Sequence, residues 1–347
     1  MSDLIFEENV PLAPLTTLKV GGPARYFARP KDVEELKAVF ERARSEDLEV
    51  FVLGGGSNVV VSDAGFDGVV VQPNFLHIAF GFTSGSNVMV VIAGAGESWD
   101  KVVEQSVRMN LAGIEALSGI PGRVGGTPIQ NVGAYGQEVS ETVVWVECFD
   151  RETNSVVRLS NADCGFKYRE SIFNTTHRDR YVVLEVNFRL EANGRPKIAY
   201  RDLKERFGGR EPSLAEVREA VLEIRRSKSM VIDEDDPNSR SAGSFFKNPI
   251  VASSVYDAIA ARFDNVPMFP AGENCVKIPA AWLIESAGFQ KGTRMGRAGI
   301  SSRHPLAIIN ADGASAAEII ALKNSIQEAV SEKFSIDLSP EPVFVGF

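Results

Sequence analysis

The sequence has few cysteines and histidines, and this scarcity limits the kinds of site that it can build. Its 347 residues include three cysteines and three histidines, and they contain neither a CxxC pair nor an HExxH motif. Cys148, Cys164 and Cys275 are too few and too widely spaced for a disulfide framework or a zinc site. We therefore expect no metal, and we expect a reducing compartment.

Basic residues are outnumbered in this chain, and long apolar runs are missing. The formal net charge is -9 and the pI is near 5.1, whereas proteins that bind nucleic acids favour a basic face. No apolar run approaches the ~20 residues that span a bilayer, and the N-terminus lacks the basic and apolar regions of a signal peptide. The sequence thus predicts a cytoplasmic protein with no nucleic-acid, membrane or obligate protein partner.

The length and the local patterns predict a mixed α and β protein of more than one domain. Helices are expected at 32–43, 98–109, 213–227, 280–287 and 315–334, with capping boxes at Asp32 and Ser315. Strands are expected at 49–53, 68–72, 88–93, 143–149, 155–159 and 181–190, the last three in one antiparallel sheet. The acidic segment 233–237 is predicted to be an exposed loop, and His177-Arg178-Asp179 a polar surface turn.

Glycines cluster directly after several predicted strands. Gly54, Gly55 and Gly56 precede Ser57 and Asn58, and further glycine stretches lie at 94–96 and 122–126. Glycine lets backbone N–H groups approach a phosphate closely. One such loop is more often a tight turn, but several together favour a dinucleotide site. None fits GxGxxG or the P-loop, so a dinucleotide would be held outside those two folds.

One long motif carries a resemblance to a known family. The stretch from Ser118 to Glu138, SGIPGRVGGTPIQNVGAYGQE, resembles the signature of the UDP-N-acetylenolpyruvoylglucosamine reductase family. Other stretches resemble family motifs in the family's order, namely TTLKVGGPA, VLGGGSNVVVSD, FKYRESIF, SAGSFFKNP, AAWLIESAGFQKG and SPEPVFVG. Together they span nearly the whole chain.

The resemblance implies a fold that composition does not reveal. It implies an α+β protein with a vanillyl-alcohol-oxidase-type (PCMH-type) FAD-binding fold and a separate α/β substrate-binding domain. The FAD-binding part is expected at 1–75 with 337–347 and at 76–229, and the substrate-binding domain at 230–336. The segment around residue 200 resembles the lid loop of the family's longer form.

The family's reaction implies two cofactors. Members reduce UDP-N-acetylglucosamine enolpyruvate to UDP-N-acetylmuramate for peptidoglycan synthesis, with FAD as the bound cofactor and NADPH as the hydride donor. Neither His nor Cys occurs in the loops at Gly54 and Gly125, so noncovalent FAD is expected. The matching motifs imply that the cofactor is bound by Gly54, Gly55, Gly56, Ser57, Asn58, Ser118, Gly119, Ile120, Pro121, Gly122, Gly125, Gly126, Gln130, Asn131, Gly133, Ala134 and Tyr135.

Three residues in the matching motifs suit the chemistry of the reduction. Arg169 can hold the substrate carboxylate with a bidentate guanidinium. In the family the serine that matches Ser244 gives a proton to the carbon next to that carboxylate, and the glutamate that matches Glu341 assists this protonation. As an isolated residue, Arg169 would be interpreted as part of a surface ion pair, and Ser244 as part of a turn or a helix cap.

The substrate contacts are also carried over by motif. Tyr168, Lys228 and Asn248 resemble substrate-binding residues, and Tyr200 resembles the tyrosine of the lid. Two positions depart from the family pattern. Phe269 stands where tyrosine is usual and cannot supply its hydroxyl, whereas His304 stands where glutamine is frequent and is a candidate contact to a carboxylate or phosphate.

Two other functions compete with this interpretation. One is an alcohol oxidase of the same fold, in which the flavin is often attached through His or Cys. The other is a nucleotide-sugar binding module without chemistry, which the presence of Arg169, Ser244 and Glu341 disfavours. A colourless protein would indicate the module, and NADPH oxidation that requires the UDP-enolpyruvyl sugar would exclude the oxidase.

Overall fold

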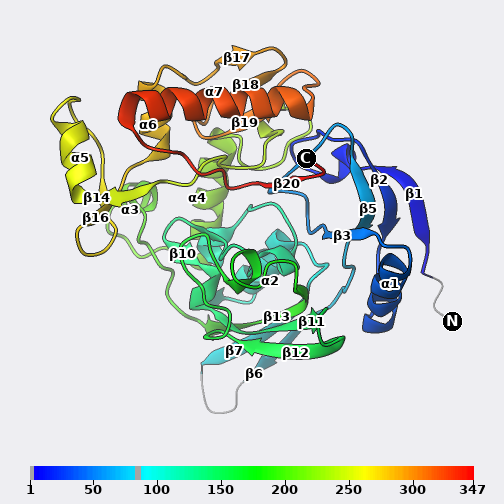
Figure 1. The fold of residues 1–347 in the computed structure, drawn as a ribbon. Coiled ribbons are helices and arrows are strands. Elements are labelled where there is room, and N and C mark those ends of the chain that lie inside the picture. The colour runs from blue at the N-terminus through cyan, green and yellow to red at the C-terminus, as the bar shows by residue number, and fades with distance from the viewer. Residues whose placement is uncertain (1–3, 83–86) are drawn as a thin grey trace. The chain divides into compact units, whose positions relative to one another are not determined.

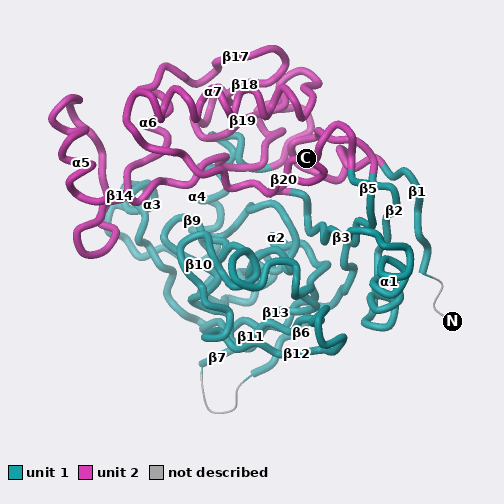
Figure 2. Tube along the Cα trace, viewed as in Figure 1, with its two compact units in different colours: residues 1–10, 24–56, 66–231 teal, residues 11–23, 57–65, 232–347 magenta. Residues whose placement is uncertain are grey.

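The computed structural model describes residues 4–82 and 87–347, which form two compact units (Figure 2). Unit 1 comprises the described parts of Met1–Val10, Ala24–Gly56 and Phe66–Val231. Unit 2 comprises Pro11–Pro23, Ser57–Gly65 and Ile232–Phe347. The chain therefore passes between the units several times, and the three-part division expected from the resemblance stays a prediction.

The first part of unit 1 is a four-stranded sheet with a helix packed on it. The strand order is β1-β2-β5-β3, and β5 pairs in parallel with both β2 and β3. The strands are β1 (Phe6–Pro11), β2 (Pro23–Ala28), β3 (Glu49–Val52) and β5 (Phe66–Val71). Helix α1 (Val33–Ser45) buries Leu36, Val39 and Phe40 against this sheet (Figure 1), because these side chains share one face at helical spacing.

The predicted start of α1 is confirmed, but only one of the two hydrogen bonds of its predicted capping box forms as expected. The Asp32 carboxylate accepts a hydrogen bond from the Glu35 backbone N–H at 2.8 Å, as an N-cap should. The Glu35 carboxylate instead accepts from the backbone N–H of Lys31 at 2.9 Å and pairs with the ammonium of Lys31 at 3.1 Å. Lys31 therefore draws the Glu35 side chain one residue beyond the N-cap.

The second part of unit 1 is a six-stranded sheet of order β12-β11-β13-β7-β6, with β8 pairing to β13. The strands are β6 (Ile78–Phe82), β7 (Val88–Gly94), β8 (Leu111–Ala112), β11 (Val143–Asp150), β12 (Ser155–Ser160) and β13 (Tyr181–Ala192). The pairs β11–β12 and β11–β13 are antiparallel, so the predicted antiparallel sheet is confirmed. Helix α2 (Trp99–Arg108) buries Trp99, Val102 and Val103 in the same core.

Two helices complete unit 1. Helix α4 (Leu214–Ser227) begins at Ser213, whose side chain forms a capping box with Glu216. The shorter α3 (Arg201–Phe207) was not predicted, and it buries Leu203 and Phe207 against α4 residues such as Val217 and Val221. The residue before α3 is Tyr200, the predicted lid.

Unit 2 is built around its longest helix, α7 (Ala316–Phe334), which packs on a small sheet (Figure 1). That sheet has the order β17-β18-β19, with strands β17 (Arg294–Met295), β18 (Ala298–Ile300) and β19 (Ile308–Asn310). The predicted capping box of Ser315 and Glu318 is confirmed. Near the C-terminus, β20 (Val343–Val345) pairs in parallel with β4 (Val59–Val61).

The remaining elements of the described residues are short. Unit 2 also contains α5 (Ser253–Ala260), α6 (Ala280–Ser286), β14 (Ile250–Ala252), β15 (Phe269–Pro270) and β16 (Cys275–Lys277). Unit 1 also contains the two-stranded pair of β9 (Gly133–Ala134) and β10 (Gln137–Glu138). The 3-10 turns are Ala13–Leu15, Glu115–Leu117, Val124–Gly126, Val139–Glu141, Ile172–Asn174 and Pro237–Ser239.

Several smaller expectations concern the surface and the cysteines. The segment 177–179 forms a polar turn before β13, as predicted. Of the predicted exposed loop at 233–237, residues 233–235 are exposed, Asp236 is half-buried and Pro237 begins a 3-10 turn. All three cysteines carry free thiols. None of the helices in residues 4–82 and 87–347 combines the length and the apolar character that a membrane span requires.

Candidate functional site

The glycine loops of unit 1 pack against one another through their backbones. A Cβ added to Gly55 would lie 2.5 Å from the Cα atom of Gly122, and one added to Gly125 would lie 2.7 Å from the Cβ of Ala95. Only glycine permits these approaches without movement of the loops. By contrast, a Cβ on Gly54 or Gly126 would meet nothing within 4 Å. The loops therefore have packed backs and open faces, which fits the close approach of a cofactor phosphate.

The segment from Ser118 to Tyr135 is held by its own side chains and by neighbouring carboxylates. The Ser118 hydroxyl donates to the carbonyl of Glu115 at 2.7 Å, and the Gly119 N–H donates to Asp100 Oδ1 at 2.6 Å. Asn131 donates to Glu138 Oε2 at 2.8 Å. Its φ of 47° and that of Tyr135, 50°, lie in the left-handed region, where a non-glycine residue is strained. The remaining predicted cofactor residues of this segment, half-buried, are Ile120, Pro121, Gln130, Gly133 and Ala134.

Arg169 lies beside this segment in unit 1. Its guanidinium donates to the carbonyl of Gly133 at 2.7 Å and lies 5.5 Å from the ring centre of Tyr168. Its φ of 57° is also left-handed. The guanidinium of Arg169 is thus held at the strand that contains Gly133. A strained backbone at a residue whose charged group is held in place is consistent with a functional position. The structure thus brings predicted catalytic and cofactor residues of unit 1 together.

The predicted lid residue contacts the predicted cofactor segment. The rings of Tyr200 and Tyr135 meet edge to face, with centroids 5.3 Å apart and an interplanar angle of 86°. Tyr200 as a whole is 44% exposed. Close to it, the Lys228 ammonium donates to Asp202 Oδ2 at 3.0 Å.

Burial and neighbouring charges shift the pKa values of several groups around Tyr135. Burial lowers the pKa of Lys228, but the hydrogen bond to Asp202 and the nearby tyrosines outweigh it, so that the pKa lies above its usual value. Burial lowers the pKa of Arg225, whose Nε is buried without a hydrogen-bond partner among the described residues. Burial also raises the pKa of Tyr135. Two cations, Lys228 and Arg225, therefore lie near Tyr135, and the first of them is paired with Asp202.

The other predicted catalytic residues lie in unit 2, where backbone hydrogen bonds join three distant segments. The Phe245 carbonyl accepts from the Glu341 N–H at 2.9 Å, and the Phe245 N–H donates to the carbonyl of Leu306 at 2.8 Å. Ser244, one residue before Phe245, lies with its Oγ 3.4 Å from Nε2 of His304. The structure thus brings Ser244, His304 and Glu341 together.

The other predicted ligand contacts of unit 2 have structural partners as well. The side-chain amide of Asn58, the residue after Ser57, donates to the carbonyl of Glu341 at 3.2 Å. Asn248 Oδ1 accepts from the Ala280 N–H at 2.9 Å at the start of α6, which leaves its amide N–H groups for a ligand. Phe269 is 55% exposed. The predicted site residues are therefore divided between unit 1 and unit 2, and those of unit 2 that contact one another are Asn58, Ser244, His304 and Glu341 or their segments.

Some residues around these groups were missed by the sequence interpretation. Asp202 pairs with Lys228, and Asp100 accepts from both Gly119 and Arg218, the latter at 2.6 Å. Asn238 Oδ1 accepts from the backbone N–H of Ser302 at 2.9 Å and so fixes the turn that carries His304. Only Asp202 had a local signal, because it lies in the predicted lid segment.

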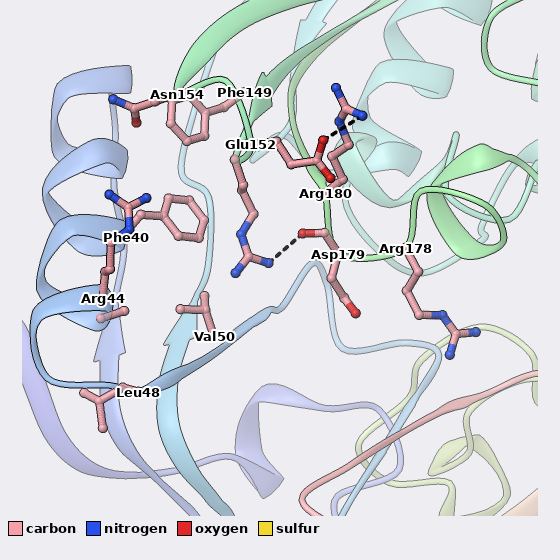
Figure 3. Close-up of a pocket in the computed structure, with 12 residues that line it drawn as sticks. Phe40, Arg44, Leu48, Val50, Phe149, Glu152, Asn154, Arg178, Asp179 and Arg180 are labelled. Atoms are coloured by element: carbon pink, nitrogen blue, oxygen red, sulfur yellow. Dashed lines mark hydrogen bonds and ion pairs between the residues drawn. The ribbon is translucent and has the colours of Figure 1, made fainter.

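A pocket of about 470 Å³ in unit 1 lies apart from these groups (Figure 3). Its lining includes the stacked rings of Phe40 and Phe149, whose centroids are 5.6 Å apart. Arg151 donates from its guanidinium to the carbonyl of Asp179 at 2.6 Å. None of the predicted site residues is among those that line this pocket.

Comparison with known proteins identifies two family matches within the chain. Residues 24–160 match the FAD binding domain, and residues 235–345 match the C-terminal domain of UDP-N-acetylenolpyruvoylglucosamine reductase. The predicted α+β fold, with an FAD-binding part and a separate second domain, is confirmed.

Relatives that align with nearly the whole chain are reductases of the same family name. The UDP-N-acetylenolpyruvoylglucosamine reductase of Thermobifida fusca is 46% identical over 353 residues, covering 98% of this chain and 98% of the relative. That of Mycobacterium marinum is 42% identical and covers 98% of this chain and 95% of the relative. Among solved structures, the Thermus caldophilus UDP-N-acetylenolpyruvylglucosamine reductase is 26% identical, with a TM-score of 0.66 and 99% coverage of each chain.

Proposed function

This chain belongs to the UDP-N-acetylenolpyruvoylglucosamine reductase family, and we propose that it reduces UDP-N-acetylglucosamine enolpyruvate to UDP-N-acetylmuramate with NADPH as the hydride donor. Membership confirms the predicted class, an FAD-dependent oxidoreductase of peptidoglycan precursor synthesis. Bound FAD supplies a group that can accept a hydride from one molecule and deliver it to another. We place this reaction in the cytoplasm.

The observation that carries the proposed reaction is the arrangement of unit 2. Backbone bonds hold the segments of Ser244 and Glu341 side by side through Phe245. Reduction of an enol ether ends with protonation of the carbon next to the carboxylate, and in this proposal Ser244 gives that proton. Glu341 assists in a protonated or hydrogen-bonded form, because a bare anion would repel the developing negative charge.

Residues of unit 1 bind the reacting groups in this proposal. The guanidinium of Arg169 holds the substrate carboxylate and stabilises the charge that develops on it. Lys228 and the lid residue Tyr200 contact the diphosphate, and Tyr168 is a further substrate contact of unit 1. Asn248 is the substrate contact proposed for unit 2. The open faces at Gly54 and Gly126 receive the cofactor.

The proposed reaction is tested by following NADPH absorbance with the purified yellow protein. Oxidation should require the UDP-enolpyruvyl sugar and should produce UDP-N-acetylmuramate in equal amount. NADPH oxidation that proceeds with oxygen alone, or alcohol-dependent bleaching of the flavin, would instead indicate an oxidase. A protein purified without colour that does not take up FAD would count against any redox role.

We expect the flavin to be bound without a covalent bond. The two thiols of unit 1 are poor attachment groups, because burial raises the pKa of Cys148 well above its usual value and that of Cys164 to about 12. Acid precipitation should therefore release all of the flavin into the supernatant. Colour that stays in the protein pellet would contradict this prediction.

Replacing Tyr200 with phenylalanine should weaken substrate binding and little else. The ring would still pack on Tyr135, and α3 would still be anchored by Leu203 and Phe207. Loss of one hydrogen bond to phosphate costs about 1 kcal/mol, or roughly a fivefold rise in KM for the sugar. Tyr181→Phe, at an aromatic residue outside the candidate site, serves as the matched control. An unchanged KM in Tyr200→Phe would exclude the lid contact.

A further inference from the structure

The imidazole of His304 is fixed against Ser244 by the backbone of unit 2. His304 lies in a turn that is closed by hydrogen bonds from Ala307 N–H to the His304 carbonyl at 3.2 Å and from Ser301 N–H to the Ala307 carbonyl at 2.9 Å. The adjoining Phe245 N–H donates to the Leu306 carbonyl at 2.8 Å. This hydrogen bond from Phe245, the residue after Ser244, therefore joins the serine segment to the turn that contains His304.

The two ring nitrogens of His304 face different partners. Nδ1 accepts from the backbone N–H of Leu306 at 3.5 Å, and Nε2 lies 3.4 Å from the Oγ of Ser244. In a neutral imidazole one nitrogen accepts and the other donates. With Nδ1 as the acceptor from this backbone donor, a neutral ring carries its hydrogen on Nε2, from which it can donate to Ser244. Contacts of this length at catalytic groups commonly tighten when the substrate binds.

We infer that His304 is a positioning residue for Ser244, which donates from Nε2 to the serine oxygen so that the serine hydrogen points to the substrate carbon. This inference rests on the proposed function, and it gives His304 a role on the serine rather than on the carboxylate or phosphate. A hydroxyl oxygen that already accepts one hydrogen bond directs its own hydrogen away from that donor.

The same contact stabilises the charge left behind by proton transfer. As the O–H bond of Ser244 breaks and a C–H bond forms on the substrate, the electron pair of the O–H bond stays on Oγ. The N–H of His304 already faces that oxygen, so the negative charge is stabilised without reorganisation. A proton from water then restores the hydroxyl, and the imidazole remains neutral throughout.

Two variants separate the donor role from a structural one. In His304→Gln the side-chain amide can reach the place of Nε2 and still donate to Ser244. In His304→Asn the shorter side chain can reach only the place of Nδ1, so it retains the acceptor for Leu306 but not the donor. The measurement is stopped-flow recovery of the flavin band when the UDP-enolpyruvyl sugar is added to NADPH-reduced protein, together with the thermal unfolding midpoint.

The inference predicts that the two His304 variants rank in opposite order in the flavin recovery rate and in the unfolding midpoint. His304→Gln should retain most of the wild-type recovery rate, whereas His304→Asn should be slower by about 10²–10³-fold, as for a lost oxyanion donor. His304→Asn should nevertheless unfold at or above the temperature of His304→Gln, because it keeps the contact to Leu306. His177→Gln, at a half-buried histidine of unit 1 outside the predicted site, should match the wild type in recovery rate.

Three results would overturn the inference. Wild-type recovery in both variants would remove His304 from the step, slow recovery only in His304→Gln would make its role structural, and equal slowing of both would require the imidazole itself. Ser244→Ala in the same assay separates this inference from the proposed function. If Ser244→Ala is slow while both His304 variants are normal, the proposed role of Ser244 stands and only that of His304 fails. Normal recovery in Ser244→Ala would instead refute the proposed proton donor.

Discussion

Replacing Ser244 with alanine is expected to slow recovery of the flavin band by ~10²–10⁴-fold when the UDP-enolpyruvyl sugar is added, as for a lost general acid. Bleaching of the same band by NADPH should proceed at nearly the normal rate, because that half of the reaction takes no proton from the serine. Stopped-flow absorbance separates the two halves. The substitution removes one hydroxyl from a half-buried position, so a large asymmetry cannot come from a general loss of folding.

Two further serine variants sharpen this expectation. Ser244→Cys should also be slow despite its more acidic group, because sulfur is larger and moves the proton from its place. Ser325→Ala, at a serine of α7 in the same unit, should leave both halves unchanged. If Ser244→Ala slows both halves equally, the serine only shapes the pocket. The proton donor would then be sought first at Glu341 or at a bound water.

Local signals account for the parts of the fold that the sequence predicted. Helices α4 and α7 have amphipathic faces and begin at serine caps, and both features depend on residues a few positions apart. Strands β11 and β13 each begin with a short apolar run, VVWV and YVVL, which can be recognised without distant information. The short α3 lacked such a signal, since its Leu203 and Phe207 gain their burial only from α4.

The division into units could not be predicted, because it depends on pairing between distant segments. Strand β4 joins unit 2 through β20, where Val60 pairs with Phe344. Neither strand exceeds three residues, so neither is long enough to show the hydrophobic periodicity that predicts a strand. The structure assigns the adjacent strands β4 and β5 to different units, whereas the segment boundary at residue 75 that the resemblance implies stays a prediction.

The candidate site was predicted by motif, but the relations among its residues were not. The motifs identified Ser244 and Lys228 without indicating that His304 and Asp202 contact them. Asn58 was assigned to the cofactor from its glycine loop, and its contact with the Glu341 carbonyl became visible only in the folded unit. Side-chain partners separated by long stretches of chain leave no periodic trace in the sequence.

Replacing Gly55 with alanine is expected to destabilise unit 1 and to cost the protein its flavin. The new methyl group would lie 2.5 Å from Cα and 2.9 Å from the carbonyl carbon of Gly122, and 3.0 Å from the nitrogen of Arg123. All three are backbone atoms, so no side chain can rotate away and the two glycine loops must separate. Overpacking of this kind costs about 1–3 kcal/mol. We expect a lower unfolding midpoint even in protein stripped of FAD.

Gly54→Ala is the matched control, because it adds the same methyl group one residue earlier, where nothing lies within 4 Å. Its effect on the flavin-free protein should stay within about 0.5 kcal/mol. If the open face of Gly54 receives the cofactor, Gly54→Ala should weaken FAD binding in a fluorescence titration without a change in the flavin-free unfolding midpoint. Gly55→Ala should change both. Wild-type stability in Gly55→Ala would mean that the loops separate at no cost, and wild-type FAD affinity in Gly54→Ala would move the cofactor away from this face. The pair thus distinguishes a glycine required by the packing of two loops from one required by the ligand, a difference that the sequence Gly-Gly-Gly by itself does not contain.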